Sequence, residues 1–113
     1  MESQIELNDE RRKLLDKFRK VLPDLMVPEI AVNDVVYKDG ALGSKVKMLM
    51  ALGIALGAGC TNCILGQTMR ALDAGATKNE LLETISVVVA MRGTTGIAES
   101  LRVLQLLEEL RKL

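Results

Sequence analysis

Both prolines of the chain, Pro23 and Pro28, lie in its first quarter, and residues 29–113 contain none. Proline disrupts a helix more than any other residue, so most of the chain is free to be helical. The apolar residues make up 49% of the sequence but include only one Phe, one Tyr and no Trp. A core of Leu, Ile, Val, Ala and Met favours helices packed closely on helices. We therefore expect an all-α fold in a single domain over residues 1–113.

Apolar periodicity and capping residues predict five or six helices. The first is expected after a cap at Asn8 or Asp9 and ends before Pro23. Residues 23–43 are predicted to be a connector with a short helix over 33–37. Ser44 is expected to cap a helix through residue 59 that is apolar on all sides after Lys47, and such a helix is buried in a core or by a partner subunit. Further helices are expected over residues 61–74, 78–92 and 97–113.

Two details of the later helices can be predicted from the residue spacing. Thr77, with Glu80 three positions later, matches a capping box at the start of the 78–92 helix. In the last helix, apolar residues share one seam that Val103 and Leu106 widen. The residues of this expected seam are Ile97, Leu101, Leu104 and Leu107.

The polar residues exclude several classes of function. Basic and acidic residues balance at 15 each, and two aromatic side chains leave little for base stacking, so we expect no nucleic-acid partner. The absence of histidine removes the commonest general base and metal ligand. The charged N-terminus has no signal-peptide core, and the apolar run over 48–60 is too short to span a bilayer. We therefore expect a cytoplasmic protein without a membrane partner.

The stretch GAGCTNCILG, residues 57–66, holds the only two cysteines, Cys60 and Cys63. Cysteines three positions apart at a helix start share roughly one face, where free backbone N–H groups and the helix dipole favour a thiolate. Two intervening residues let the sulfur atoms bond with little backbone movement, so the spacing suits a reversible dithiol. In a reducing compartment such a pair is more often catalytic or metal-binding than structural.

Two other interpretations of the pair stay open from spacing alone. Cys60 and Cys63 could be packed residues at a tight join between helices, because free cysteine is often buried. They could also form part of a metal or iron–sulfur site shared across a subunit interface, although a zinc site within one chain normally needs about four ligands. No flavin or nicotinamide motif is present, so we expect no cofactor, no metal and an external electron donor.

The text from Asp39 to Ile85 resembles the carboxymuconolactone decarboxylase and alkylhydroperoxidase D superfamily over about 40% of the chain. The shared pattern is a Leu-Ser-like turn, a lysine, a helix rich in small residues, Gly-Cys-x-x-Cys, an alanine-rich helix, Gly-Ala-Thr and an acidic cap. Its members here are Leu42, Ser44, Lys45, residues 51–58, Gly59, Cys60, Cys63, Ala71, residues 75–77 and Glu80. The resemblance implies an alkylhydroperoxidase D-like helical bundle that assembles as a homo-oligomer, with a hexamer favoured over a trimer.

Two positions depart from the peroxidase-type members of that superfamily. Those members have a Glu twelve residues before the first cysteine and a His four residues after the second, and the pair relays protons to activate the thiol. Met48 and Gln67 occupy these positions here. Met48 cannot take a proton, and Gln67 can hydrogen-bond a sulfur atom but cannot act as an acid or base. The dithiol is therefore retained without the relay, which favours thiol–disulfide exchange over peroxide reduction.

Together these observations predict an enzyme, a thiol–disulfide oxidoreductase of the disulfide-reductase type that could support peroxide defence. Cys60 and Cys63 would be its catalytic residues, acting on a disulfide-containing protein or small molecule. Supporting roles are assigned to Gln67, Tyr37 and Glu80, although Tyr37 also fits a turn and Glu80 a helix cap. The alternatives are a non-enzymatic helical oligomer that binds a small apolar ligand or a partner protein, and the peroxidase or decarboxylase activities of other superfamily members.

A positive charge near a thiol favours the thiolate, so a cation close to the cysteine pair would activate it. Lys45, Arg70 and Arg92 are predicted to be able to act in this way across an interface.

Overall fold

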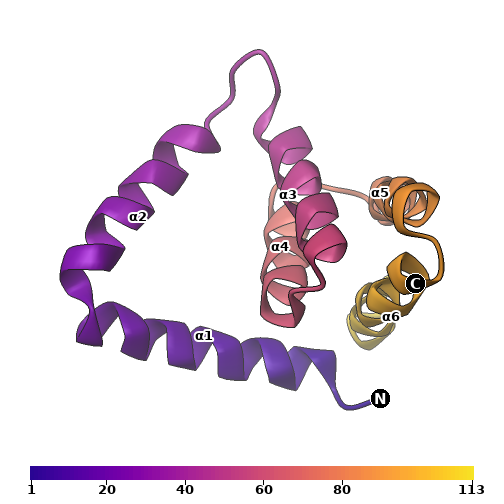
Figure 1. Ribbon diagram of the computed structural model, residues 1–113, viewed down its shortest axis with the longest axis horizontal. Coiled ribbons are helices and arrows are strands. Elements are labelled where there is room, and N and C mark those ends of the chain that lie inside the picture. The colour runs from indigo at the N-terminus through magenta and orange to yellow at the C-terminus, as the bar shows by residue number, and fades with distance from the viewer.

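The computed structural model describes all of residues 1–113 and contains six α-helices and no strand, which confirms the all-α prediction. The helices are α1 (Gln4–Val21), α2 (Pro23–Val36), α3 (Ser44–Ala58), α4 (Thr61–Asp73), α5 (Lys78–Arg92) and α6 (Thr94–Glu109). Helices α3 to α6 form a bundle, and α1 and α2 form an arm that extends from it (Figure 1). None of the six is long and apolar enough to cross a membrane.

The bundle has an aliphatic core to which all four of its helices contribute. Leu52 and Leu56 of α3 are fully buried, and each such side chain contributes about 1.5–3 kcal/mol relative to an exposed one. The other buried members of this cluster are Ala55, Ile64, Ala71, Ala76, Leu81, Val88, Val103 and Leu107. The core therefore holds together residues 52–107, which include both cysteines.

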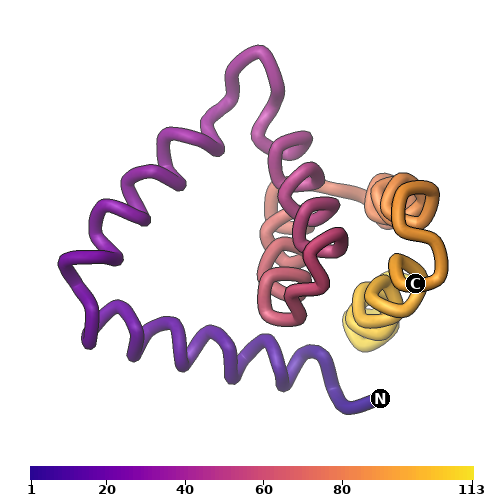
Figure 2. The backbone as a smooth tube through the Cα atoms, in the orientation of Figure 1, coloured from indigo at the N-terminus to yellow at the C-terminus, as the bar shows by residue number.

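The arm buries far less than the bundle. No residue of α2 is buried, and the buried residues of α1 are the polar Gln4 and Asn8 near its start. Figure 2 shows the chain running out along α1, turning, and returning along α2 to the start of α3. The whole chain exposes 7127 Å², whereas a compact monomer of 12.3 kDa exposes about 6,100 Å². Much of this excess surface is apolar, because α2 alone exposes six Val, Ile and Leu side chains with exposed fractions of 40% or more.

The carboxylate of Glu109, at the end of α6, anchors the start of the arm. It accepts hydrogen bonds from Ser3 Oγ at 2.6 Å, from the Gln4 backbone N–H at 2.8 Å and from that of Ile5 at 3.2 Å. These bonds satisfy free N–H groups in the first turn of α1. They also lower the pKa of Glu109 from 4.5 to about 2, with the Ser3 bond as the largest cause.

Two expectations about the first helices are wrong. Helix α1 begins at Gln4 with Ser3 as its N-cap, since Ser3 Oγ accepts from the Glu6 backbone N–H. Asn8 lies inside this helix, where its side chain accepts from Arg11. The expected connector over 23–43 is instead mostly helix α2, with Pro23 in its first turn, where proline is tolerated.

The helices that follow differ from expectation in their ends and faces. Thr77 and Glu80 form the predicted capping box, but Ser44 is the first residue of α3 rather than its cap. The core of this chain does not bury helix α3 on all sides, since Ile54 is 71% exposed, so its burial by a partner subunit stays a prediction. The expected apolar face of α6 is confirmed in part, because Val103, Leu106 and Leu107 are buried. Ile97 and Leu101 of the expected seam are instead about half exposed, and Ser100 is buried.

Candidate active site at the start of helix α4

A left-handed glycine positions the two cysteines. Gly59 ends α3 with φ +70°, a conformation that costs little for glycine and is strained for other residues. This turn lets the Cys60 backbone N–H donate to Ala55 O and directs the chain into α4. Cys60 is the N-cap of α4, and its Sγ accepts from the Cys63 backbone N–H at 3.2 Å. The first turn of α4 therefore directs one backbone N–H group, that of Cys63, at the Cys60 sulfur atom.

Cys60 and Cys63 are joined by a disulfide, with their Cα atoms 5.2 Å apart. This separation lies within the range that a disulfide spans without backbone movement. Cys63 is exposed and Cys60 is partly exposed, so neither is sealed in the core. The pair can therefore open and close while α4 stays in place.

The residue before Cys60, Gly59, lies against the end of α5 and the first half of α6. Arg92 Nη1 donates to Leu56 O at 2.6 Å, and the same carbonyl oxygen accepts from the Gly59 backbone N–H at 3.3 Å. A Cβ placed on Gly59 would lie 3.5 Å from Glu99 Oε1 and 3.9 Å from Arg92 Nη1. A cation and a carboxylate thus lie beside the residue that precedes Cys60. The sequence drew attention to Arg92 but not to Glu99, which becomes a neighbour only through the packing of α6.

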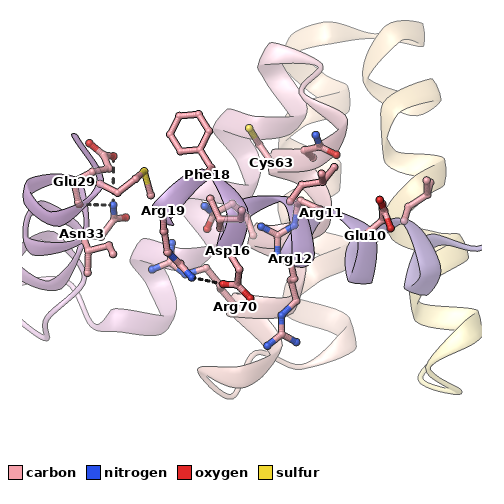
Figure 3. A pocket seen from close by; sticks show the side chains of 18 of the residues that line it. Glu10, Arg11, Arg12, Asp16, Phe18, Arg19, Glu29, Asn33, Cys63 and Arg70 are labelled. Atoms are coloured by element: carbon pink, nitrogen blue, oxygen red, sulfur yellow. Dashed lines mark hydrogen bonds and ion pairs between the residues drawn. The ribbon is translucent and has the colours of Figure 1, made fainter. Parts of the chain in front are cut away.

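The Cys63 side faces a cavity of about 970 Å³ between α4 and the arm. Cys63, Gly66, Gln67 and Arg70 of α4 line one wall, and residues of α1 and α2 line the other (Figure 3). The Gln67 carbonyl oxygen Oε1 is buried and has no hydrogen-bond donor within reach. Gln67 therefore lies on the wall that carries Cys63, one helical turn further along α4.

The structure places the other predicted supporting residues away from the sulfur atoms. The Arg70 guanidinium stacks on the Tyr37 ring at 4.5 Å, two helical turns along α4 from Cys63. Glu80 accepts from the Thr77 backbone N–H and pairs with Lys45 at 2.9 Å. The hydrogen bond with Lys45 is the largest cause that lowers the pKa of Glu80. Lys45 belongs to the first turn of α3 and the cysteines follow its last turn, about 20 Å further on.

The two positions that depart from the peroxidase pattern differ in their surroundings. Met48 packs against the core as a partly buried side chain, so it fills space between helices. Gln67 lines the cavity beside Cys63. No group of three or more His, Cys, Asp or Glu side chains is placed to hold a metal ion.

Comparison with known sequences agrees with this arrangement. The profile of the Carboxymuconolactone decarboxylase family matches residues 29–106, which run from α2 to α6. A Paracoccus denitrificans protein named uncharacterized protein 4 in cox locus is 35% identical over 81 residues, which cover 72% of this chain and 73% of that protein. An uncharacterized protein of Cupriavidus necator is 37% identical over 59 residues, or 52% of each chain.

Solved structures show the same fold over nearly the full length. The crystal structure of apo-lpg0406, a carboxymuconolactone decarboxylase family protein from Legionella pneumophila, has a TM-score of 0.87 and 32% identity, covering 94% of this chain and 95% of that one. The crystal structure of TM1620 from Thermotoga maritima has a TM-score of 0.80 and 28% identity, covering 91% and 90%. The chain belongs to the carboxymuconolactone decarboxylase family.

Proposed function

We propose that this protein is a thiol–disulfide oxidoreductase that reduces disulfides with Cys60 and Cys63. The observation that carries the proposal is the disulfide itself, which lies at the start of α4 with one sulfur residue exposed beside a cavity. A helix start lowers the free energy of a thiolate through its free N–H groups and dipole. A buried structural staple would need neither the exposure nor the cavity.

Cys63 is the attacking residue in this proposal, because it is the exposed member of the pair and lines the cavity. Its thiolate forms a bond with one substrate sulfur atom, and the other half of the substrate leaves as a thiolate that takes up a proton. The Cys60 thiolate then attacks Cys63 Sγ and releases the second half. Two electrons pass from the dithiol to the substrate, and an external dithiol returns them.

Disulfide exchange suits this site better than peroxide reduction or decarboxylation. The relay positions hold Met48, packed against the core, and Gln67, which cannot transfer a proton. Exchange depends on the thiolate, on the leaving thiol and on access, and requires no relay. A reducing compartment such as the cytoplasm suits the proposal, because it keeps the resting pair reduced and ready to attack.

We also propose that copies of the chain assemble as a homo-oligomer. The arm exposes a row of apolar side chains along α2, among them Val27 and Val35, which are 68% and 69% exposed. A second apolar surface lies between α3 and α5, where Ile54, Val87 and Met91 are exposed around a shallow hollow. Apolar surface of this extent on a small chain favours association. Copies of the chain are the occupants we propose, with a hexamer as the expected state.

Reduction of insulin by dithiothreitol tests the function directly. The native chain is expected to accelerate the reaction, and Cys63→Ser to fall to the uncatalysed rate. Cys60→Ser is expected to slow turnover because it cannot resolve the mixed disulfide. When this reduced variant is mixed with insulin after dithiothreitol is removed, the mixed disulfide on Cys63 is expected to accumulate and to be visible as a mass increase. Equal rates for the native chain and both variants would refute the proposal.

A further inference from the structure

One face of α4 combines the exposed cysteine with positive charge. Cys63, Gly66, Gln67 and Arg70 follow one another at helical spacing, so their side chains share the wall of the cavity. Arg70 lies seven residues from Cys63, or about 10 Å along the helix. A molecule whose disulfide reaches Cys63 from the cavity can therefore extend over Gly66 and Gln67 towards Arg70.

Gly66 brings a second cation onto this face. A Cβ placed on Gly66 would lie 3.0 Å from Arg11 Cζ and within 3.3 Å of both Nη atoms. The guanidinium of Arg11, which comes from α1, therefore packs against the helix at a point where only glycine leaves room. Figure 3 shows Arg11, Arg70 and Cys63 around the same cavity. The positive charge of Arg11 thus lies about one helical turn from Cys63.

Neither guanidinium has a carboxylate partner within the chain. Arg11 donates through Nε to Asn8 Oδ1 at 2.9 Å, and Arg70 stacks on Tyr37. The two salt bridges of the structure are Arg19–Asp16 and Lys45–Glu80, which involve neither residue. A partly buried cation without a counter-ion can still form an ion pair with an incoming anion.

The other charged groups of the cavity do not neutralise Arg11. Among the acidic residues of its lining, Asp16 pairs with Arg19, Glu29 accepts from Asn33, and Glu10 and Asp34 bond to no cation. Burial lowers the pKa of Arg11, followed by repulsion from Arg12, Arg19 and Arg70, and no carboxylate acts on it. Because no carboxylate of the lining pairs with Arg11, its guanidinium stays available for an incoming anion.

A third group on the same wall requires a hydrogen-bond donor. Gln67 Oε1 is buried without a partner, and a buried carbonyl oxygen in that state costs free energy until a donor reaches it. Gln67 lies between the positions of Cys63 and Arg70 on α4. A ligand that interacts with Cys63, with Gln67 and with the arginines thus combines a disulfide, an N–H group and a carboxylate.

We propose that the cavity between α4 and the arm binds anionic, peptide-like disulfides, with a carboxylate on Arg11 and Arg70, an amide N–H on Gln67 and the disulfide at Cys63. This inference rests on the proposed function and names its substrate class. The cavity volume of about 970 Å³ is large enough for a short peptide disulfide. Exchange proceeds with the atom and electron balance given above, and the carboxylate binding orients the substrate sulfur towards Cys63.

Three small disulfides of different charge test the kinetic consequence. The reduced chain, freed of dithiothreitol, is mixed with oxidised glutathione (anionic), hydroxyethyl disulfide (neutral) or cystamine (cationic), and formation of the Cys60–Cys63 disulfide is timed. Each rate is divided by that of free dithiothreitol with the same probe, which removes differences in intrinsic reactivity. The expected order is anionic, then neutral, then cationic.

Variants test whether Arg11 causes the preference for the anionic probe. Arg11→Gln is expected to lower the glutathione-to-hydroxyethyl ratio about tenfold, the change typical of losing a hydrogen bond to a charged group. Gly66→Ala is expected to lower it in the same direction, since its Cβ displaces the guanidinium. Lys17→Gln removes an exposed cation of α1 outside the cavity and is the matched control. Equal normalised rates for the three probes, or a ratio unchanged by Arg11→Gln, would refute the inference.

A binding measurement separates failure of the site from failure of the chemistry. S-methylglutathione carries the carboxylates and amides but no disulfide, so its heat of binding to the full chain reports the anion site alone. We expect saturable binding that Arg11→Gln weakens about tenfold and Lys17→Gln leaves unchanged. Absence of binding would overturn the inference, whereas binding without any disulfide exchange would support the site and refute the proposed function.

Discussion

The α3–α6 bundle and the α1–α2 arm are built by different interactions. The bundle is held by aliphatic side chains from four helices, and its leucines 52, 56 and 81 are fully buried. The arm is attached by polar contacts, such as the bonds of Glu109 to the start of α1, and α2 buries no residue at all. Burial of apolar side chains is the larger source of stability, so the bundle is expected to carry most of the folding free energy.

The disulfide lies on the border between these two regions. Gly59, which precedes Cys60, lies beside Arg92 and Glu99 of the bundle, and Cys63 lines the cavity whose far wall is the arm. The bundle therefore fixes the geometry of the pair, while the arm forms the far wall of the cavity in which we propose that a substrate binds. Binding sites commonly place a less stable element over a rigid scaffold in this way.

The largest expected difference between the two regions is in stability. Leu56→Ala removes a fully buried side chain and is expected to lower the free energy of unfolding by about 2–5 kcal/mol. Leu25→Ala, at a position of α2 that is 56% exposed, is expected to change it by less than about 0.5 kcal/mol in dilute solution. Urea denaturation at low chain concentration measures both. Equal losses would show that the arm belongs to the same core as the bundle.

The next effect concerns association through the arm. Val35→Asp places a charge on the exposed apolar face of α2 and is expected to weaken self-association more than about 100-fold, because a buried charge without a partner is unfavourable. Sedimentation velocity would show the shift towards the 12.3 kDa chain. Lys17→Asp introduces the same side chain at an already charged position of α1 and is the control. An unchanged assembly in Val35→Asp would place the interface elsewhere.

The sequence predicted the bundle well and the arm poorly, for physical reasons. The capping box of Thr77 and Glu80 and the alanine and leucine spacing act within a few residues, so they are readable from the sequence. Helix α2 buries no hydrophobic face against the other helices of the chain, and its two prolines led us to predict a connector. In α6 the buried Val103, Leu106 and Leu107 were predicted, but spacing also selected Ile97 and Leu101, where packing buries Ser100 instead.

The candidate site likewise contains residues that are neighbours in the sequence and residues that come from distant helices. The Cys60–Cys63 pair could be predicted, because the two residues are neighbours on one helix turn. Arg11 and Glu99 could not, since each reaches the site from another helix. Gly66 was the available signal for Arg11, because a glycine inside a helix often marks a close approach.

A smaller effect concerns the pH dependence of the anchor of the arm. The pKa of Glu109 is about 2 in the fold against an ordinary 4.5, so folding favours its charged form. Its contribution is therefore complete above pH 4.5 and declines as the pH falls towards 2. Glu109→Gln is expected to weaken the start of α1 by about 1 kcal/mol at neutral pH, typical of a lost helix cap. Hydrogen exchange of the Gln4 and Ile5 amides measures this loss of stability at the start of α1.

The neighbouring carboxylate supplies the control for that experiment. Glu108 is exposed and makes no hydrogen bond to α1, so Glu108→Gln is expected to leave the exchange of both amides unchanged. Equal behaviour of the two variants would mean that Glu109 does not hold the arm to the bundle.

The smallest expected effect lies where the bundle meets the disulfide. In a Cys63→Ser background Cys60 is the only thiol, and Glu99 is the carboxylate beside Gly59, the residue that precedes it. A negative charge disfavours a nearby thiolate, so Glu99→Gln is expected to speed alkylation of Cys60 by iodoacetamide about two- to threefold at pH 7. Arg92→Gln is expected to slow it, and Glu108→Gln to leave it unchanged. Because both neighbours belong to α5 and α6, opposite shifts in these two variants would show that the bundle sets the reactivity of Cys60, and identical rates would show that it only holds the residue in place.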